Sequence, residues 1–151
     1  DYFKSISQQE KFGIRMHYLR NDNNTLGLIE KTQYEFDSTI YKMEDPYKIG
    51  ELWEFPLHIM DGYIIENGKS WQNINLEQAK KNTLARIKEV EGKKLKYLNI
   101  LFHDRYFTEA YKTWKAWYTW LIEWLDSNGY DFVSFKQAVL ELNGKAKEVQ
   151  K

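Results

Sequence analysis

The sequence predicts an α/β fold in which parallel strands alternate with helices. Short apolar runs alternate with amphipathic segments of helical spacing along the 151 residues, and charged side chains follow several runs where a strand would end. Successive right-handed βαβ units of this kind build a parallel sheet, either a small open sheet or part of a barrel. A chain of this length is the size of one domain, so we expect a single domain over residues 1–151 with a frayed tail at 144–151.

Three apolar runs in the first 60 residues have the pattern of strands: 12–18, 34–37 and 52–60. Residues 25–32, between the first two runs, have helical spacing. Residues 41–51 form the most loop-like stretch because they contain Pro46 and Gly50. In the third run, Pro56 indicates a sheet edge or a bulge.

The clearest helix signal begins at Asn75. Asn75 and Gln78 resemble a capping box, and apolar residues recur on one face until Gly92 ends the pattern. The following run, 95–102, is almost continuously apolar, which predicts a strand buried on both faces.

The remaining residues predict a long helix, a short strand and a last helix. Apolar residues form one stripe over 107–126, and Gly129 is expected to cap that helix. Residues 131–133 have the pattern of a strand, and Ser134 has that of the N-cap of a helix over 135–142.

Composition excludes several classes of function. Lysine and arginine balance aspartate and glutamate, 22 against 22, so we expect no nucleic-acid partner. No apolar run approaches the roughly 18 residues of a membrane span. The absence of cysteine excludes disulfides, thiolate metal sites and a cysteine nucleophile, and leaves the compartment open between bacterial cytoplasm and cell envelope. The aromatic content of 17% suits sugar stacking, and equally the filling of a core.

Candidate site residues gather where predicted strands end, because the carboxyl ends of parallel strands meet at one edge of a sheet. These residues are Arg15, His17, Tyr18, Asp37, Met60, Asp61, His103 and Asp104. His103 is the strongest candidate, since a histidine that ends an apolar strand lies where its pKa can suit proton transfer near neutral pH. The structural alternative is a histidine that caps the strand by hydrogen bonding.

The other strand-end residues have simpler alternatives. Arg15 has a planar guanidinium that can orient a carboxylate, or it can pair with a surface acid. Asp37 and Asp61 occupy turn positions, where an aspartate usually bonds the local backbone.

Other catalytic signatures are absent from the sequence. It contains no G-x-S-x-G elbow, no glycine-rich phosphate loop, no H-E-x-x-H and no H-x-x-x-H motif. A site made of the three histidines, His17, His58 and His103, would need three separate predicted strands to converge at one edge of the sheet, which the fold allows but nothing local enforces. The sequence therefore predicts no complete metal site.

Several segments together resemble the polysaccharide deacetylase family, the nodulation-deacetylase-like hydrolases. Gly13-Ile14-Arg15-Met16-His17-Tyr18 resembles the family's R-x-P-Y motif, and Leu101-Phe102-His103-Asp104 is similar to its L-x-H motif. Residues 34–39 and 54–61 are similar to two strand-end segments of deacetylases and their allantoinase-like relatives, and residues 128–135 resemble the usual final turn into the last strand, all in the same order. The resemblance covers nearly the whole chain.

The resemblance implies a distorted (β/α) barrel that removes acetyl groups from N-acetylated polysaccharide. In this family an aspartate and two histidines bind a divalent metal, zinc being expected first, and a second aspartate activates water. By resemblance, Arg15 orients that base, and His103 protonates the leaving amine. Asp61 tethers His103 or lines the pocket. The substrate-binding residues implied are Tyr18, through its backbone N–H, Leu101 in the acetyl pocket, Met60 and His17.

Two departures from the family pattern change what we expect of this chain. His17 stands where the family has proline, and the metal-binding motifs that precede the arginine motif have no counterpart. We therefore expect the C-terminal half of a deacetylase barrel, inactive alone, whose metal-binding N-terminal half is supplied in the same or another chain. The alternative is a catalytically inactive glycan-binding or structural module of the same fold. An allantoinase-like relative with a non-sugar substrate also stays open.

Overall fold

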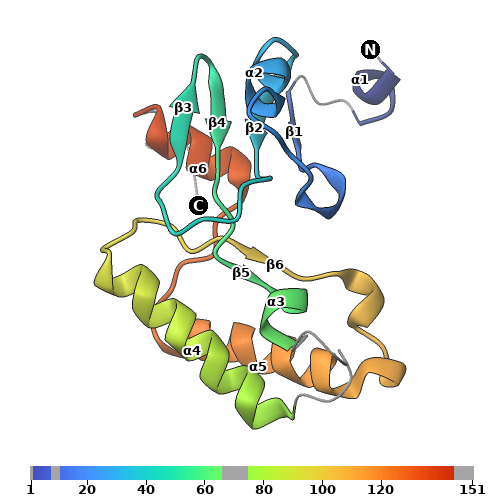
Figure 1. The fold of residues 1–151 in the computed structure, drawn as a ribbon, viewed down its shortest axis with the longest axis vertical. Helices are drawn as coiled ribbons and strands as arrows, with labels where there is room; N and C mark the ends of the chain where they lie inside the picture. Colours follow the sequence, from blue (N-terminus) through green and yellow to red (C-terminus); the bar gives the residue numbers. More distant parts are fainter. Residues whose placement is uncertain (1, 8–10, 66–74, 145–151) are drawn as a thin grey trace. The chain divides into compact units, whose positions relative to one another are not determined.

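The computed structural model describes residues 2–7, 11–65 and 75–144. The chain divides into two compact units (Figure 1). Unit 1 comprises Asp1–Tyr41, Pro46–Pro56 and Phe132–Lys151, and unit 2 comprises Lys42–Asp45 and Leu57–Asp131. Both units combine helices with parallel strands, which confirms the predicted α/β class. The expected single domain over residues 1–151 stays a prediction, and its frayed tail lies outside the described residues apart from Gly144.

Unit 1 is built on a four-stranded sheet of order β1-β2-β4-β3. Its strands are β1 (Phe12–Ile14), β2 (Tyr34–Asp37), β3 (Tyr47–Ile49) and β4 (Leu52–Glu54). Strands β1, β2 and β4 run parallel, and β3 is antiparallel to β4. The helices of unit 1 are α1 (Tyr2–Ser7), the 3-10 turn η1 (His17–Leu19), α2 (Thr25–Glu30) and α6 (Phe135–Leu142). The predictions for β2, α2 and α6 are confirmed, and β1 is shorter than the predicted strand.

Aromatic packing joins α6 to this sheet. Phe135 stacks on Phe36 with 4.8 Å between ring centroids and meets Phe55 edge-on at 5.2 Å. Phe36 also covers Gly13 on the neighbouring strand, where a Cβ atom would lie 1.9 Å from the Phe36 ring. Position 13 therefore accepts only glycine while Phe36 keeps this place.

Two predictions for unit 1 are wrong. Residues 41–51 are not all loop, because β3 forms and a two-residue turn at Gly50 and Glu51 leads into β4. Gly50 has a φ of 57°, which suits such a turn. Residues 131–133 form no strand: they are exposed and lead directly to Ser134, whose side chain accepts the Gln137 N–H as predicted for an N-cap.

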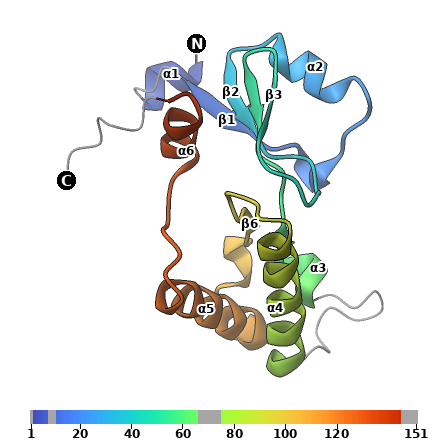
Figure 2. The same ribbon diagram turned by 90° about the vertical axis from the view of Figure 1, so that its left-hand side faces the viewer.

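Unit 2 pairs two short parallel strands with helices. The strands are β5 (Ile59–Met60) and β6 (Ile100–Leu101). The helices are α3 (Asp61–Ile65), α4 (Leu76–Gly92), η2 (Asp104–Tyr106), η3 (Glu109–Tyr111) and α5 (Lys112–Ser127). Helices α4 and α5 lie side by side (Figure 2). Pro56 stands between β4 and β5, where the chain passes from unit 1 to unit 2.

The core of unit 2 is apolar with one satisfied polar chain inside it. Trp117 of α5 is fully buried, and its indole N–H donates to the Thr83 hydroxyl at 2.7 Å. Thr83 donates in turn to the Ala79 carbonyl at 2.8 Å, so the buried Trp117 indole nitrogen and the Thr83 hydroxyl both have partners. The rest of the core cluster is Ile59, Ile64, Ile65, Ala79, Ile87, Tyr106, Trp114, Leu121 and Leu125.

In unit 2, the predicted cap and end of α4 and the glycine after α5 are confirmed, and two element lengths are wrong. Asn75 caps α4 by accepting the Gln78 N–H, and Gly129 follows α5 with a φ of 78°. The predicted buried strand over 95–102 is only two residues long and half-buried, because β5 offers just two residues to pair with it. The long helix starts at Lys112 and not at residue 107, since two 3-10 turns precede it.

Candidate functional site

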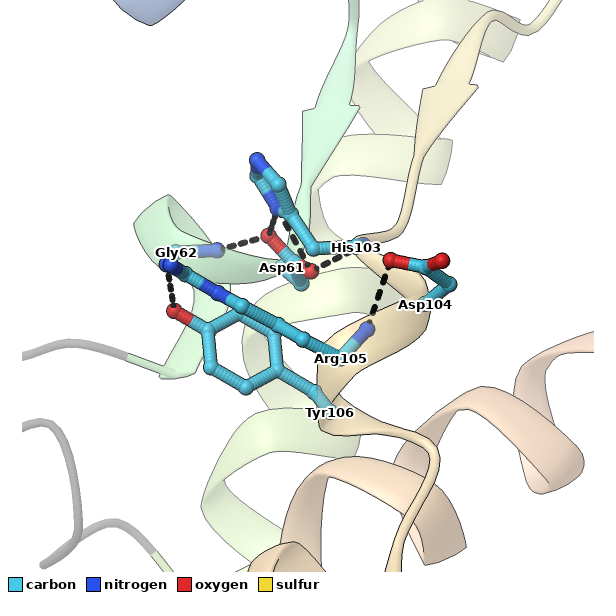
Figure 3. A network of polar contacts seen from close by, with 6 residues as sticks. All are labelled: Asp61, Gly62, His103, Asp104, Arg105 and Tyr106. Carbon is cyan, nitrogen blue, oxygen red and sulfur yellow. Dashed lines mark hydrogen bonds and ion pairs between the residues drawn. The ribbon is translucent and has the colours of Figure 1, made fainter.

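Asp61 and His103 form a hydrogen-bonded pair at the carboxyl ends of β5 and β6 (Figure 3). The Nδ1 atom of His103 lies 2.9 Å and 3.0 Å from the two carboxylate oxygens of Asp61. The backbone N–H groups of Gly62 and His103 donate to the same carboxylate at 2.6 Å and 2.7 Å. The Asp61 side chain is 0% exposed and that of His103 is 42% exposed.

The short ladder explains why the two residues meet. Met60 pairs with Leu101 in parallel register, so the segments that follow β5 and β6 leave the ladder at the same end. Asp61 follows β5 directly and begins α3, while His103 comes two residues after β6 and precedes η2. Asp61 is thus the first residue of a helix, which corrects the turn position expected for it.

The geometry fixes which nitrogen of His103 carries a proton. A carboxylate only accepts hydrogen bonds, so Nδ1 must be the donor toward Asp61. In the neutral ring this leaves Nε2 with its lone pair, and in the protonated ring Nε2–H becomes a second donor. Since the His103 ring is partly exposed, it can exchange a proton with a substrate or with solvent.

Aromatic and cationic groups of η2 stand next to this pair. The Tyr106 ring meets the His103 ring edge-on, with 5.7 Å between centroids, and Tyr106 itself is buried. Arg105 lies over the Tyr106 ring at 4.6 Å and donates to the Tyr106 hydroxyl. These contacts restrict the tilt of the His103 ring on the side that faces Tyr106.

Met60 and Leu101 are half-buried and face each other across the ladder one and two residues before the pair. The structure therefore brings Asp61, His103, Met60 and Leu101 together. Arg15, His17 and Tyr18 belong to unit 1.

Arg15, the first residue after β1, is held by Ser38, the first residue after the neighbouring strand β2. Its Nε donates to the Ser38 carbonyl and its Nη2 to the Ser38 hydroxyl, both at 2.8 Å. Burial lowers the pKa of Arg15 below its ordinary value, while the carboxyl groups of Asp37 and Glu54 oppose this shift. Arg15 is therefore a fixed, partly buried guanidinium and not a mobile surface charge.

His17 and Tyr18 lie on the surface of unit 1. Both are exposed, Tyr18 at 75%, and their rings are 4.1 Å apart. Tyr18 and Leu19 have φ values of 55° and 53°, a left-handed conformation that is unusual for such side chains. His17 therefore opens a 3-10 turn with a strained backbone.

His58 is a structural histidine. It is buried, its Nε2 bonds the Glu44 carbonyl at 2.9 Å, and its Nδ1 accepts the Asn99 N–H at 3.0 Å. Burial lowers the pKa of His58, which favours the neutral ring that these two bonds require. With both nitrogens engaged, His58 has no lone pair left for a metal.

No group of three histidine, aspartate or glutamate side chains that could hold a metal ion occurs within residues 2–7, 11–65 and 75–144. None of the helices in that described part combines the length and apolar character that a membrane span requires.

Glu54 is the site residue that the sequence analysis missed. It is 0% exposed, as is Asp37, with which it pairs between β2 and β4. Each is the acidic last residue of an apolar strand, and that shared pattern is the signal that could have found the pair.

Comparisons with known proteins leave the family assignment a prediction. No family model matches the chain, and neither a curated protein nor a solved structure matches it significantly.

Proposed function

We propose that this chain supplies the general acid, His103, of a metal-dependent hydrolase that removes acetyl groups from N-acetylated polysaccharide. The observation that carries the proposal is the pairing of His103 with the buried carboxylate of Asp61. The resemblance of residues 13–18 and 101–104 to deacetylase motifs supplies the reaction class. For the fold, we propose that the parallel strands form part of a distorted (β/α) barrel.

Hydrolysis of an acetamido group needs a proton donor where the amine leaves. Water adds to the carbonyl carbon, the C–N bond breaks, and the nitrogen departs with the bonding electron pair. In the proposal, Nε2–H of protonated His103 gives this nitrogen its proton, so the products are acetate and a free amine. Asp61 holds the ring and stabilises the imidazolium charge through Nδ1–H. The proton taken from water goes to a base outside this chain.

The remaining residues have positioning roles in this proposal. Arg15 orients the base, the Tyr18 backbone N–H faces the developing oxyanion, and Leu101 with Met60 lines the acetyl pocket. His17 adds a polar contact to the glycan. The fixed guanidinium of Arg15 and the half-burial of Met60 and Leu101 suit these roles.

The metal of the proposed reaction has no assigned ligand here. The described residues contain no suitable cluster of acidic and histidine side chains, so in the proposal the ligands come from outside those residues, and none of the steps above runs through the metal. When bound, a divalent ion would polarise the carbonyl and activate water.

Acetate release by a longer form of the protein tests the proposal. The form includes any residues that the gene encodes before Asp1, and the substrate is an oligomer of N-acetylglucosamine. We expect His103→Ala to lower kcat at least about 100-fold and Asp61→Asn at least about tenfold, because general-acid catalysis contributes roughly 10²–10⁴. Lys88→Ala, a change at an exposed residue of α4, should leave kcat unchanged.

Two results would count against the proposed role. Zinc-loaded protein whose acetate release survives His103→Ala would remove His103 from the reaction. Glycan binding without any acetate release, in the presence of added zinc, would favour the non-catalytic module.

A further inference from the structure

Asp37 and Glu54 stand opposite each other in the parallel sheet of unit 1. They are the last residues of β2 and β4, and they are register partners, so their side chains leave the sheet on the same face. Neighbouring strands are only about 4.8 Å apart. Both side chains are 0% exposed, so bulk solvent does not screen the two carboxyl groups from each other.

Asp37 has hydrogen-bond donors for both of its oxygens. The Thr39 backbone N–H donates to Oδ2 at 3.0 Å, and the Thr39 hydroxyl donates to Oδ1 at 2.8 Å. The Thr39 hydroxyl oxygen accepts the Met16 N–H at 2.9 Å. Asp37 is therefore connected through one side chain to the backbone that follows Arg15.

Glu54 has a donor for only one of its oxygens. The Ile40 N–H donates to Oε1 at 3.0 Å, whereas Oε2 is buried and has no hydrogen-bond partner in the part of the chain that the structure describes. A buried oxygen without a partner is costly, and two carboxylates side by side repel each other. One proton on Oε2 removes both penalties, because the hydroxyl can then donate to Asp37.

We propose that Asp37 and Glu54 share one buried proton and that this acid pair positions Arg15. The pair lies under the loop that holds the guanidinium: Ser38, which accepts both Arg15 hydrogen bonds, is flanked by Asp37 and Thr39. The proton sharing is independent of the proposed function, and only the catalytic use of Arg15 rests on it.

The electrostatics of the pair agree with this geometry. Burial first, and then the hydrogen bond and charge of Asp37, raise the pKa of Glu54 to about 9, while the Ile40 N–H and Arg15 oppose the rise. On the side of the sheet opposite Asp37, Glu54 pairs with Tyr47 of β3. At neutral pH the pair therefore carries one negative charge, which Arg15 balances.

Carbon-13 NMR of the 151-residue chain tests the shared proton directly. The carboxyl carbon of Glu54, assigned by its loss in Glu54→Gln, should titrate with a midpoint near 9 instead of the ordinary 4.5. A midpoint below 7 in the folded chain would overturn the proposal. Asp37→Asn should lower the Glu54 midpoint by at least one pH unit, and an unchanged midpoint would show that burial acts without any sharing.

The Arg15 Cζ signal tests the positioning step. In the unmodified chain it should move with the Glu54 midpoint, since loss of the shared proton disturbs the loop around Ser38. In Glu54→Gln it should stay constant over the same pH range, because the Gln side-chain amide can donate to Asp37 as the acid does. The matched control Glu51→Gln, at a 94% exposed side chain, should titrate like the unmodified chain. An Arg15 signal that ignores the Glu54 titration would remove the positioning role.

Discussion

The two ends of the β5–β6 ladder each hold a histidine, and the surroundings of these histidines differ. His58 precedes β5, is 1% exposed, and bonds backbone atoms of Glu44 and Asn99 through both ring nitrogens. His103 follows β6, has a 42% exposed side chain, and bonds the carboxylate of Asp61 through one nitrogen. The His58 ring serves as hydrogen-bond partner to two backbone groups. His103 uses only Nδ1 to bond Asp61, which leaves Nε2 for proton transfer. What separates them is the number of ring nitrogens left unbound, since both stand beside apolar strands.

The largest effect on stability is expected at the buried end of the ladder. His58→Ala removes two hydrogen bonds and leaves a cavity, so the free energy of unfolding should fall by roughly 3–4 kcal/mol. Urea unfolding followed by circular dichroism measures this change. His17→Ala, at an exposed histidine, is the control and should change the free energy by less than about 0.5 kcal/mol. A loss below 1 kcal/mol for His58→Ala would show that the two side-chain hydrogen bonds of His58 contribute little to stability.

A smaller effect on the free energy of unfolding is expected from His58 when the pH is lowered. The pKa of His58 in the folded chain lies below the ordinary 6.5, so the unfolded chain binds more protons at pH values between the two. The contribution of His58 to the free energy of unfolding is fully present above about pH 6.5. It is lost as the pH falls from there toward the pKa of His58 in the folded chain.

Urea unfolding between pH 7.5 and 5.5 should therefore show a decline, with a slope of at most about 1.4 kcal/mol per pH unit from this residue. His58→Gln should flatten the decline, and His17→Ala should keep it. A decline of equal size in all three proteins would assign the effect to other groups.

The smallest effect on stability is expected at the exposed end. His103→Ala removes one hydrogen bond, and Asp61 keeps the Gly62 and His103 backbone donors, so the free energy of unfolding should fall by about 1 kcal/mol. The same urea series measures it. A loss as large as that of His58→Ala would mean that both histidines are structural, and the comparison would fail.

The predicted elements with local signals are the ones that the structure confirms. Helices α4 and α6 are capped by Asn75 and Ser134, whose side chains accept backbone N–H groups three residues on, and such caps are visible in sequence. Strand β2 matches the predicted range. These signals need no knowledge of which segments pair in space.

Elements that depend on pairing were missed or mis-sized. Strand β3 has three residues in a stretch that looked like loop, and β6 has two residues in an eight-residue apolar run. Their lengths are set by partner strands, which sequence periodicity does not reveal.

The candidate site was predictable in part for the same reason. His103 and Asp61 were singled out because they follow apolar runs, but their contact depends on the register of Met60 with Leu101. Glu54 was missed because its meaning comes from Asp37 on a neighbouring strand. Nothing in the local sequence separated His58 from His103.

The division of unit 1 into distant stretches of chain has a consequence for the order of folding. Its sheet is complete by residue 54, yet Phe36 and Phe55 are covered by Phe135, and Trp53 donates to Asn143, 90 residues further on. Closing a loop of that length costs roughly 4 kcal/mol of chain entropy. During synthesis the strands of unit 1 are therefore made long before α6, the helix that shields their aromatic face, and that face stays open to wrong partners until α6 has been made.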